Sequence, residues 1–137
     1  MINEYNYKYI VENIKDLSIY MLDQNGRVIT WNEGAKRIKG YSEKEVIGQF
    51  MSIFYTQEDI LQNRANRDLE IALKQGIFEN EGLRVRKDGT LFLAQTTLST
   101  IKDPDGKILC LAKITRDITD KRKAEEQFKL ALEASPN

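Results

Sequence analysis

The chain has 137 residues, of which 41% are hydrophobic and 31% charged, and this size and balance are typical of one soluble globular domain. Lysine and arginine together number 21, as do aspartate and glutamate, so the chain lacks the basic excess of most nucleic-acid-binding proteins. The absence of histidine and the single cysteine exclude a histidine-activated nucleophile, a structural zinc site and an internal disulfide.

The N-terminal part predicts a helix followed by two strands. A helix within residues 1–16 is indicated by apolar side chains at helical spacing, which are Tyr7, Ile10, Val11 and Ile14. We expect a strand from Leu17 to Asp23 and a returning strand from Arg27 to Trp31. The tight turn Asp23–Gly26 joins them and contains asparagine and glycine, which tolerate positive φ.

The middle of the chain predicts helices. Asn32 is a good N-cap for a short helix, and Gly40 is suited to end it in the left-handed conformation. Ser42–Glu45 has the spacing of a capping box. The longest helix is expected to start between Thr56 and Asp59 and to close at Gly76. Its apolar stripe would consist of Leu61, Ala65, Leu69, Ala72 and Leu73.

Three further strands are predicted after this helix. They are Ile77–Lys87, Thr90–Ile101 and Lys107–Arg116, separated by the turns Lys87–Gly89 and Asp103–Gly106. Two strands, a helical middle and three strands fit a single five-stranded antiparallel sheet with helices over one face.

The last part of the chain predicts a helix of a different kind. From Asp120 onward the sequence is rich in lysine, arginine, glutamate and alanine. Its apolar residues follow a helical seam and are Ala124, Phe128, Ala131 and Leu132. We therefore divide the chain into an N-terminal flanking helix (1–16), a core (17–119) and a linker helix (120–137) that leads to a further domain.

Three blocks of sequence, taken together, resemble the PAS sensory domain. They are Val28–Ala35, which follows the Asp23–Gly26 hairpin, then Gly40–Ser42 and finally Arg116–Thr119. The resemblance covers residues 8–122. It implies the α+β PAS fold, in which a five-stranded antiparallel sheet of order 2-1-5-4-3 has helices over one face. The final residues, from Leu132 to Asn137, resemble the beginning of another PAS domain.

The resemblance also implies a function. PAS domains of this kind are non-catalytic sensor or relay domains of bacterial signalling proteins, most often histidine kinases of two-component systems. A signal or small ligand would act through the C-terminal helix on an output domain of the same polypeptide. The alternative, from a different class, is a structural homodimerisation module without a ligand. An enzyme is disfavoured by the small inventory of catalytic acids and bases.

We expect a cytoplasmic location, although the parent protein could be anchored to a membrane by another segment. The single cysteine suits a reducing compartment. No apolar run approaches the roughly 18 residues of a membrane-spanning helix, so we expect no membrane contact by this chain. We expect no contact with nucleic acid either, because the net charge is zero.

PAS domains can hold a flavin, a heme or another small ligand between sheet and helices. The heme of oxygen-sensing PAS domains needs an axial histidine, which this chain lacks. Light-sensing domains of the LOV type carry a photoactive cysteine three residues after a glycine, and here the residue three positions after Gly48 is Met51. We therefore expect neither a histidine-ligated heme nor a LOV-type flavin adduct. The leading expectation is a cavity filled by side chains, while noncovalent flavin and another small ligand stay open.

The resemblance to LOV and heme-binding PAS domains implies which strand residues face this space. The candidate pocket residues are Tyr20, Leu22, Met51, Phe54, Leu69, Leu73, Arg84, Ala94, Thr96, Leu98, Lys113 and Thr115, and the same register turns Leu111 inward. Plain alternation of apolar and polar residues would instead bury Leu83, Val85 and Ile114. Both sets are buried if the outer face of the sheet is covered by the N-terminal helix or a second subunit, so we expect a homodimer.

The junction between the last strand and the last helix is a candidate for signal transfer. Asp117 and Thr119 both have side-chain oxygens that can cap the first N–H groups of a helix. In PAS domains this junction couples distortion of the sheet to the output helix. Asp117 is also expected to pair with a basic residue, with Arg86 or Lys87 the nearest candidates. The alternative is an ordinary helix cap without a signalling role.

Overall fold

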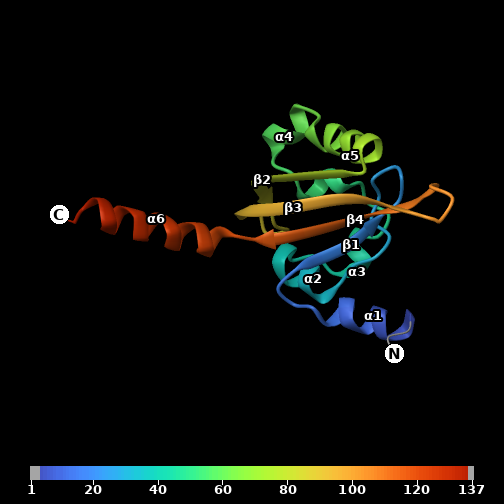
Figure 1. Cartoon of the computed structure of the whole chain (residues 1–137), viewed down its shortest axis with the longest axis horizontal. Helices are drawn as coiled ribbons and strands as arrows, with labels where there is room; N and C mark the ends of the chain where they lie inside the picture. Colours follow the sequence, from blue (N-terminus) through green and yellow to red (C-terminus); the bar gives the residue numbers. More distant parts are fainter. Residues whose placement is uncertain (1–3, 136–137) are drawn as a thin grey trace.

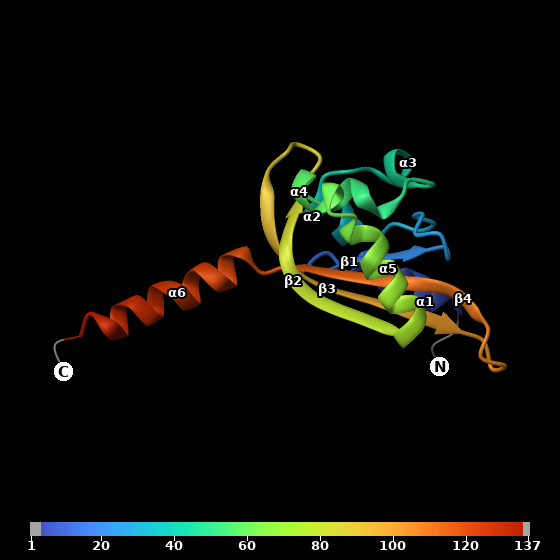
Figure 2. The same cartoon turned by 90° about the horizontal axis from the view of Figure 1, so that it is seen from above.

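The computed structural model describes residues 4–135, with side chains from residue 8 onward. Four strands form one antiparallel sheet in the order β1-β4-β3-β2, and helices lie over one of its faces (Figures 1 and 2). The strands are β1 (Ser18–Leu22), β2 (Ile77–Val85), β3 (Leu91–Lys102) and β4 (Ile108–Asp117). The helices are α1 (Glu4–Asn13), α2 (Glu33–Lys39), α3 (Glu43–Val46), the 3₁₀ turn η1 (Met51–Phe54), α4 (Gln57–Leu61), α5 (Arg64–Gln75) and α6 (Thr119–Glu133).

The prediction of a fifth strand at Arg27–Trp31 is wrong, because within the described residues this segment forms only isolated bridges. The predicted order of the other four strands is confirmed. One backbone hydrogen bond, from the N–H of Ile29 to the carbonyl of Met21, joins this segment to β1, and two side chains accept the neighbouring bonds. The backbone N–H of Met21 donates to Oγ1 of Thr30 at 2.9 Å. The N–H of Ile19 donates to Oδ1 of Asn32, also at 2.9 Å. Since side-chain oxygens replace carbonyls there, the edge is satisfied without a regular fifth strand.

Asn32 also fixes the start of α2 against the connection that precedes β1. Its Oδ1 accepts a hydrogen bond from the N–H of Ala35 at 2.8 Å, which confirms the predicted N-cap. Its amide nitrogen donates to three carbonyl oxygens, those of Val11, Ile14 and Leu17, at 3.1–3.2 Å. A Cβ on the neighbouring Gly34 would lie 1.8 Å from the carbonyl oxygen of Leu17, so only glycine permits this close approach.

The predicted long helix is interrupted. Asn63 has a φ of 58°, in the left-handed region, and separates α4 from α5. Asparagine tolerates that conformation better than most residues, which explains why the break occurs there. Leu61 ends α4 with 78% of its surface exposed, so its assignment to the apolar stripe was wrong. The stripe begins on α5, where Ala65, Leu69 and Ala72 are buried and Leu73 is partly buried.

The two end helices lie at opposite sides of the fold (Figure 1). The helix α1 packs beside α2. Its residue Val11 and Ile14, which follows the helix, are partly buried, while Ile10 is exposed; the side chain of Tyr7 lies outside the described residues. The helix α6 leaves β4 and projects away from the sheet, with no buried residue (Figure 2). Pro136 and Asn137, which end the segment that resembles the beginning of another PAS domain, also lie outside the described part. No helix within residues 4–135 has the length and hydropathy needed to cross a bilayer.

Candidate functional site

The space between the sheet and the helices contains a cluster of aromatic rings. The rings belong to Tyr20 of β1, Trp31, Tyr41 and Phe54 of η1. Phe54 lies 5.5–5.8 Å from each of the other three rings, and the rings of Tyr20 and Trp31 lie 5.0 Å apart, measured between ring centres. The indole N–H of Trp31 donates to the backbone carbonyl of Tyr41 at 2.9 Å, so this ring is fixed in orientation. Such a cluster supplies a rigid, largely apolar wall.

Three cationic side chains are buried against this wall. Lys39 of α2, Arg84 of β2 and Lys113 of β4 are 0%, 3% and 1% exposed. The Nζ atoms of both lysines have no hydrogen-bond partner among the described residues, and neither do Nε and one terminal nitrogen of Arg84. Lysine and arginine are almost never fully buried without a partner, so this cluster is unusual for a structural core.

The ammonium groups of the two lysines lie against aromatic rings. Lys39 Nζ lies 4.4 Å from the ring centre of Phe54 and 5.6 Å from that of Tyr20. Lys113 Nζ lies 4.9 Å from the ring centre of Tyr55 and 5.9 Å from that of Tyr20. Cation–π attraction of this kind contributes up to about 2 kcal/mol, less than the several kcal/mol that burial of an ion costs.

The electrostatic surroundings disfavour the charged forms of both lysines. Burial lowers the pKa of Lys39 to about 7, and the nearby charge of Arg84 contributes to the decrease. Burial lowers the pKa of Lys113 well below its usual range, with Arg84 and Lys39 lowering it further and Asp68 opposing them. The positive charges of these three side chains therefore disfavour one another.

A row of polar side chains crosses the sheet beside Lys113. Neighbouring strands place Ser18, Thr115, Thr96 and Asn80 opposite one another, one from each of β1, β4, β3 and β2. Each has a buried side-chain oxygen without a hydrogen-bond partner among the described residues. The hydroxyl of Tyr20 is also buried without a partner, and burial raises the pKa of this tyrosine well above its usual value, with Tyr55 adding to the increase and Arg84 opposing it. The inner face thus presents hydroxyl donors next to buried cations.

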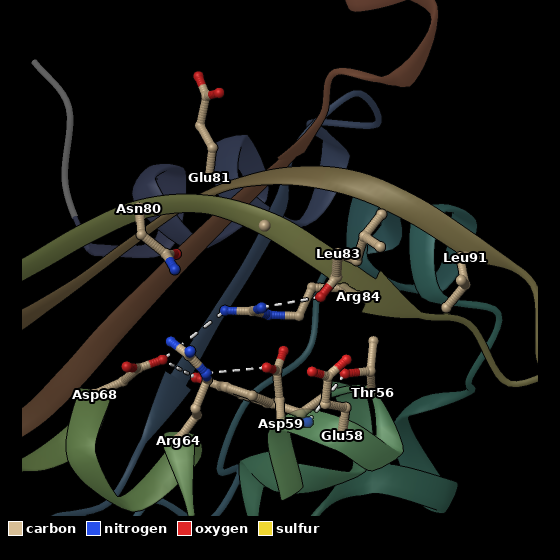
Figure 3. Close-up of a pocket in the computed structure, with 12 residues that line it drawn as sticks. Thr56, Glu58, Asp59, Arg64, Asp68, Asn80, Glu81, Leu83, Arg84 and Leu91 are labelled. Carbon is tan, nitrogen blue, oxygen red and sulfur yellow. Dashed lines mark hydrogen bonds and ion pairs between the residues drawn. The ribbon is translucent and has the colours of Figure 1, made fainter. Parts of the chain in front are cut away.

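Arg84 connects this cluster to an open pocket of about 430 Å³ (Figure 3). Its guanidinium lies 4.1 Å from the ring centre of Tyr55, and one of its nitrogens lies 3.9 Å from a carboxylate oxygen of Asp68. The same oxygen accepts a 2.6 Å hydrogen bond from the hydroxyl of Tyr55. Tyr55, Asp68 and Arg84 line the pocket, and the ring of Tyr55 also contacts Lys113, so these side chains separate the pocket from the buried lysine.

Burial confirms the inward register that the resemblance implied. Of the predicted pocket residues, Tyr20, Leu22, Met51, Phe54, Leu69, Arg84, Ala94, Thr96, Leu98, Lys113 and Thr115 are buried, as is Leu111, and Leu73 is partly buried. Leu83 and Ile114, which plain alternation would bury, are 47% and 39% exposed, and Val85 is intermediate. That these residues bind a ligand stays a prediction.

Sequence reasoning missed four side chains of the site, namely Lys39, Tyr55, Asp68 and Phe92. A signal for Lys39 existed, because it follows the buried Ala35 by four residues on α2 and therefore shares its inward face. Phe92 precedes the predicted inward residue Ala94 by two positions in β3, so strand alternation also indicated it.

The strand–helix junction is held by the side chains of Asp117 at the end of β4, Arg86 just after β2 and Thr119 at the start of α6. Asp117 Oδ2 accepts a 2.6 Å hydrogen bond from Arg86, and Oδ1 accepts one from the N–H of Thr119 at 3.0 Å. Arg86 is thus the partner of Asp117, whereas Lys87 pairs with Glu45. The hydroxyl of Thr119 does not cap α6 but accepts a hydrogen bond from the N–H of Leu93 in β3 at 2.9 Å.

Comparisons with known proteins agree with this fold. Residues 5–120 match the family model of the PAS domain. Over 129 residues the chain is 39% identical to two-component system protein A of Emericella nidulans, covering 94% of this chain and 19% of the relative. Over 133 residues it is 22% identical to sporulation kinase C of Bacillus subtilis, covering 92% of this chain and 30% of the relative. The chain therefore spans less than a third of either relative.

A solved PAS domain from Colwellia psychrerythraea has the same fold. It superposes with a TM-score of 0.75 at 22% identity, covering 86% of this chain and 99% of that domain. This likeness shows the shared architecture, and the family model spans most of the chain. The chain thus belongs to the PAS domain family.

Proposed function

We propose that this PAS domain is a non-catalytic, cytoplasmic sensor or relay within a longer signalling protein. It receives a signal in the core and passes it through β4 and α6 to an output domain of the same polypeptide, such as a histidine kinase. The two-component and kinase names of the relatives support this context. The relatives are also much longer than this chain, as expected if PAS domains are joined to other domains in them.

The connection between the core and α6 is the observation that carries the proposal. A single strand, β4, holds Lys113 in the buried cluster and Asp117 at the start of α6. Asp117 is tied to Arg86, whose guanidinium lies 4.6 Å from the ring centre of Phe92, and this ring also lies 5.8 Å from Lys39 Nζ. A movement of the buried cluster can therefore reach the strand–helix junction either along β4 or through Phe92 and Arg86.

Replacing Asp117 with alanine tests the relay. In the full-length protein, Asp117→Ala should uncouple output activity from the stimulus, because the carboxylate of Asp117 links the first N–H of α6, that of Thr119, to Arg86. In the isolated domain the same change removes a partly exposed ion pair and a local hydrogen bond, so it should destabilise folding by only about 0.5–2 kcal/mol. Output activity and thermal unfolding are the two measurements.

The matched control is Asp120→Ala, which removes an exposed carboxylate from the first turn of α6 without touching the junction. This variant should respond to the stimulus like wild type. If Asp117→Ala also responds like wild type, Asp117 is an ordinary helix cap and the relay assignment fails.

A second function, homodimerisation, is favoured by the apolar side chains that remain exposed. The outer face of the sheet and the two end helices present Ile10, Met21, Leu83, Leu91, Ile114, Phe128, Leu130 and Leu132. Burying each large side chain contributes about 1.5–3 kcal/mol, so a second copy of the chain is a suitable cover. We propose a dimer through α1 and the outer face, as in a structural module that needs no ligand.

Sedimentation or light scattering over a concentration series tests the dimer. The mass should approach twice 15.9 kDa as the concentration rises. Ile114→Lys, which places a charge on the outer face, should shift the equilibrium toward the monomer. A wild-type mass that stays monomeric throughout would contradict the dimer.

A further inference from the structure

We propose that Lys39, Arg84 and Lys113 form a binding site for a small organic carboxylate in the core of the domain. The carboxylate would serve as the counterion of these buried cations. The site itself is inferred from the cluster, whereas the role of this ligand as the signal rests on the proposed sensor function.

The buried charges of the described residues do not balance. Three cations lie in the core with one buried carboxylate, that of Asp68. Asp68 accepts a hydrogen bond from Tyr55 and approaches only Arg84, at 3.9 Å. Burial disfavours the charged forms of both lysines, and an anion from outside the chain would restore them by supplying a paired charge.

The polar groups around the cluster match the acceptor atoms of a carboxylate. Lys113 of β4 lies directly opposite Tyr20 of β1 and Leu98 of β3. Two residues further along β4, on the same face of the sheet, Thr115 lies opposite Thr96 of β3. The hydroxyls of this tyrosine and both threonines are buried without partners. Ammonium, guanidinium and hydroxyl groups all donate hydrogen bonds, and a carboxylate accepts up to about four.

The surroundings also favour an organic anion over an inorganic one. The rings of Phe54, Tyr20 and Tyr55 lie within 6 Å of the ammonium groups and give the site apolar walls. A small hydrocarbon body attached to the carboxylate would contact these rings, whereas a free phosphate would leave them unused. The guanidinium of Arg84, with its planar fork, is suited to a planar carboxylate.

The open pocket of Figure 3 lies next to the cluster, because Arg84 and Tyr55 line both. Its lining includes Arg64 and the carboxylates of Glu58, Asp59, Asp68 and Glu81, whereas Lys39 and Lys113 lie deeper in the core. The contact of Arg84 with Asp68 is too long for a strong hydrogen bond, so an incoming carboxylate would compete with Asp68 for the guanidinium.

Titration of the 137-residue protein with acetate, butyrate, succinate and benzoate, with inorganic phosphate as the comparison, tests the site. At least one carboxylate should bind saturably in calorimetry and raise the unfolding temperature by several degrees at saturation. At pH 8, where Lys39 is largely neutral, binding should also take up protons, which calorimetry in two buffers of different ionisation enthalpy measures. Proton uptake distinguishes binding at the cluster from adventitious surface binding.

Lys39→Met and Lys113→Met should each weaken binding at least tenfold, whereas Lys36→Met, an exposed change on the same helix as Lys39, should not. The two core variants lose a buried charge and stay folded, so a lost response is not due to unfolding. The proposal is overturned if no carboxylate binds, if phosphate alone binds, or if the core variants bind like wild type. The Asp117 test of output coupling is independent of these results, so either proposal can fail alone.

Discussion

Replacing Lys39 with methionine should raise the unfolding temperature of the ligand-free domain by about 5–10 °C at pH 7. The side chain of Lys39 is fully buried, and its ammonium group has no hydrogen-bond partner among the described residues. Methionine has similar length and flexibility, so it can contact the ring of Phe54 without the cost of burying a charge. The cation–π contact that is lost is smaller than the desolvation penalty that is removed.

Thermal unfolding of wild type and variant under identical conditions measures this effect. Lys36→Met is the matched control, because Lys36 is exposed on α2, and its substitution should change stability by less than about 0.5 kcal/mol. An unchanged or lower unfolding temperature for Lys39→Met would mean that Lys39 does not destabilise the fold. The buried lysine would then have a structural role and would not indicate an anion-binding site.

The stability of the ligand-free domain should increase with pH between about 7 and 9.5. The pKa of Lys39 is about 7 in the folded protein, and that of Lys113 is also lowered, whereas both have the ordinary value in the unfolded chain. In this window the unfolded state therefore binds more protons, and the free energy of unfolding rises by up to about 1.4 kcal/mol per pH unit for each group.

Five side chains face Lys39, and the tyrosine among them limits the pH range over which the free energy of unfolding rises. They are Tyr20 of β1, Arg84 of β2, Phe92 of β3, Lys113 of β4 and Phe54 of η1. The pKa of Tyr20 is raised by burial, so this tyrosine contributes stability that is lost as the pH rises above about 10, where the unfolded chain ionises. The same holds for Tyr55, whose pKa is also raised mainly by burial. We therefore expect a maximum near pH 10.

Urea unfolding at half-unit pH steps measures the profile, because the midpoint and slope give the free energy at each pH. The double variant Lys39→Met and Lys113→Met should have a flat profile between pH 7 and 9.5. A wild-type profile that is flat or falls across this window would contradict the lowered pKa values. It would mean that the lysines keep their protons in the folded core.

The register of the sheet was predictable from the sequence only through the family resemblance. Alternation alone favoured burial of Leu83 and Ile114, because the outer face carries apolar residues too. The resemblance instead placed Arg84 and Lys113 inside, against the usual preference of charged residues for water, and the structure confirms it. Binary patterning assigns charged residues to the surface, so it fails wherever the fold buries them.

Local effects of single residues explain the errors in secondary structure. The segment Arg27–Trp31 has the composition of a strand, but Thr30 and Asn32 satisfy the edge of β1 with their side chains. The helix predicted from Thr56 onward contains Asn63, whose left-handed conformation interrupts it. Neither effect changes the periodicity of apolar residues, so a pattern-based prediction does not detect them.

The attachment of α6 by its first turn alone has a mechanical consequence. Thr119 accepts a hydrogen bond from the N–H of Leu93, and Arg122 pairs with Glu81, so the start of α6 is tied to the sheet. None of the 15 residues of this helix is buried, so it would act as a lever about 22 Å long that pivots at this turn. A tilt of about 5° at the pivot displaces the far end by about 2 Å, the scale of a helix shift in many switches. Under the proposed signalling role, a small rearrangement of buried side chains would become a movement of this size at the end of the helix.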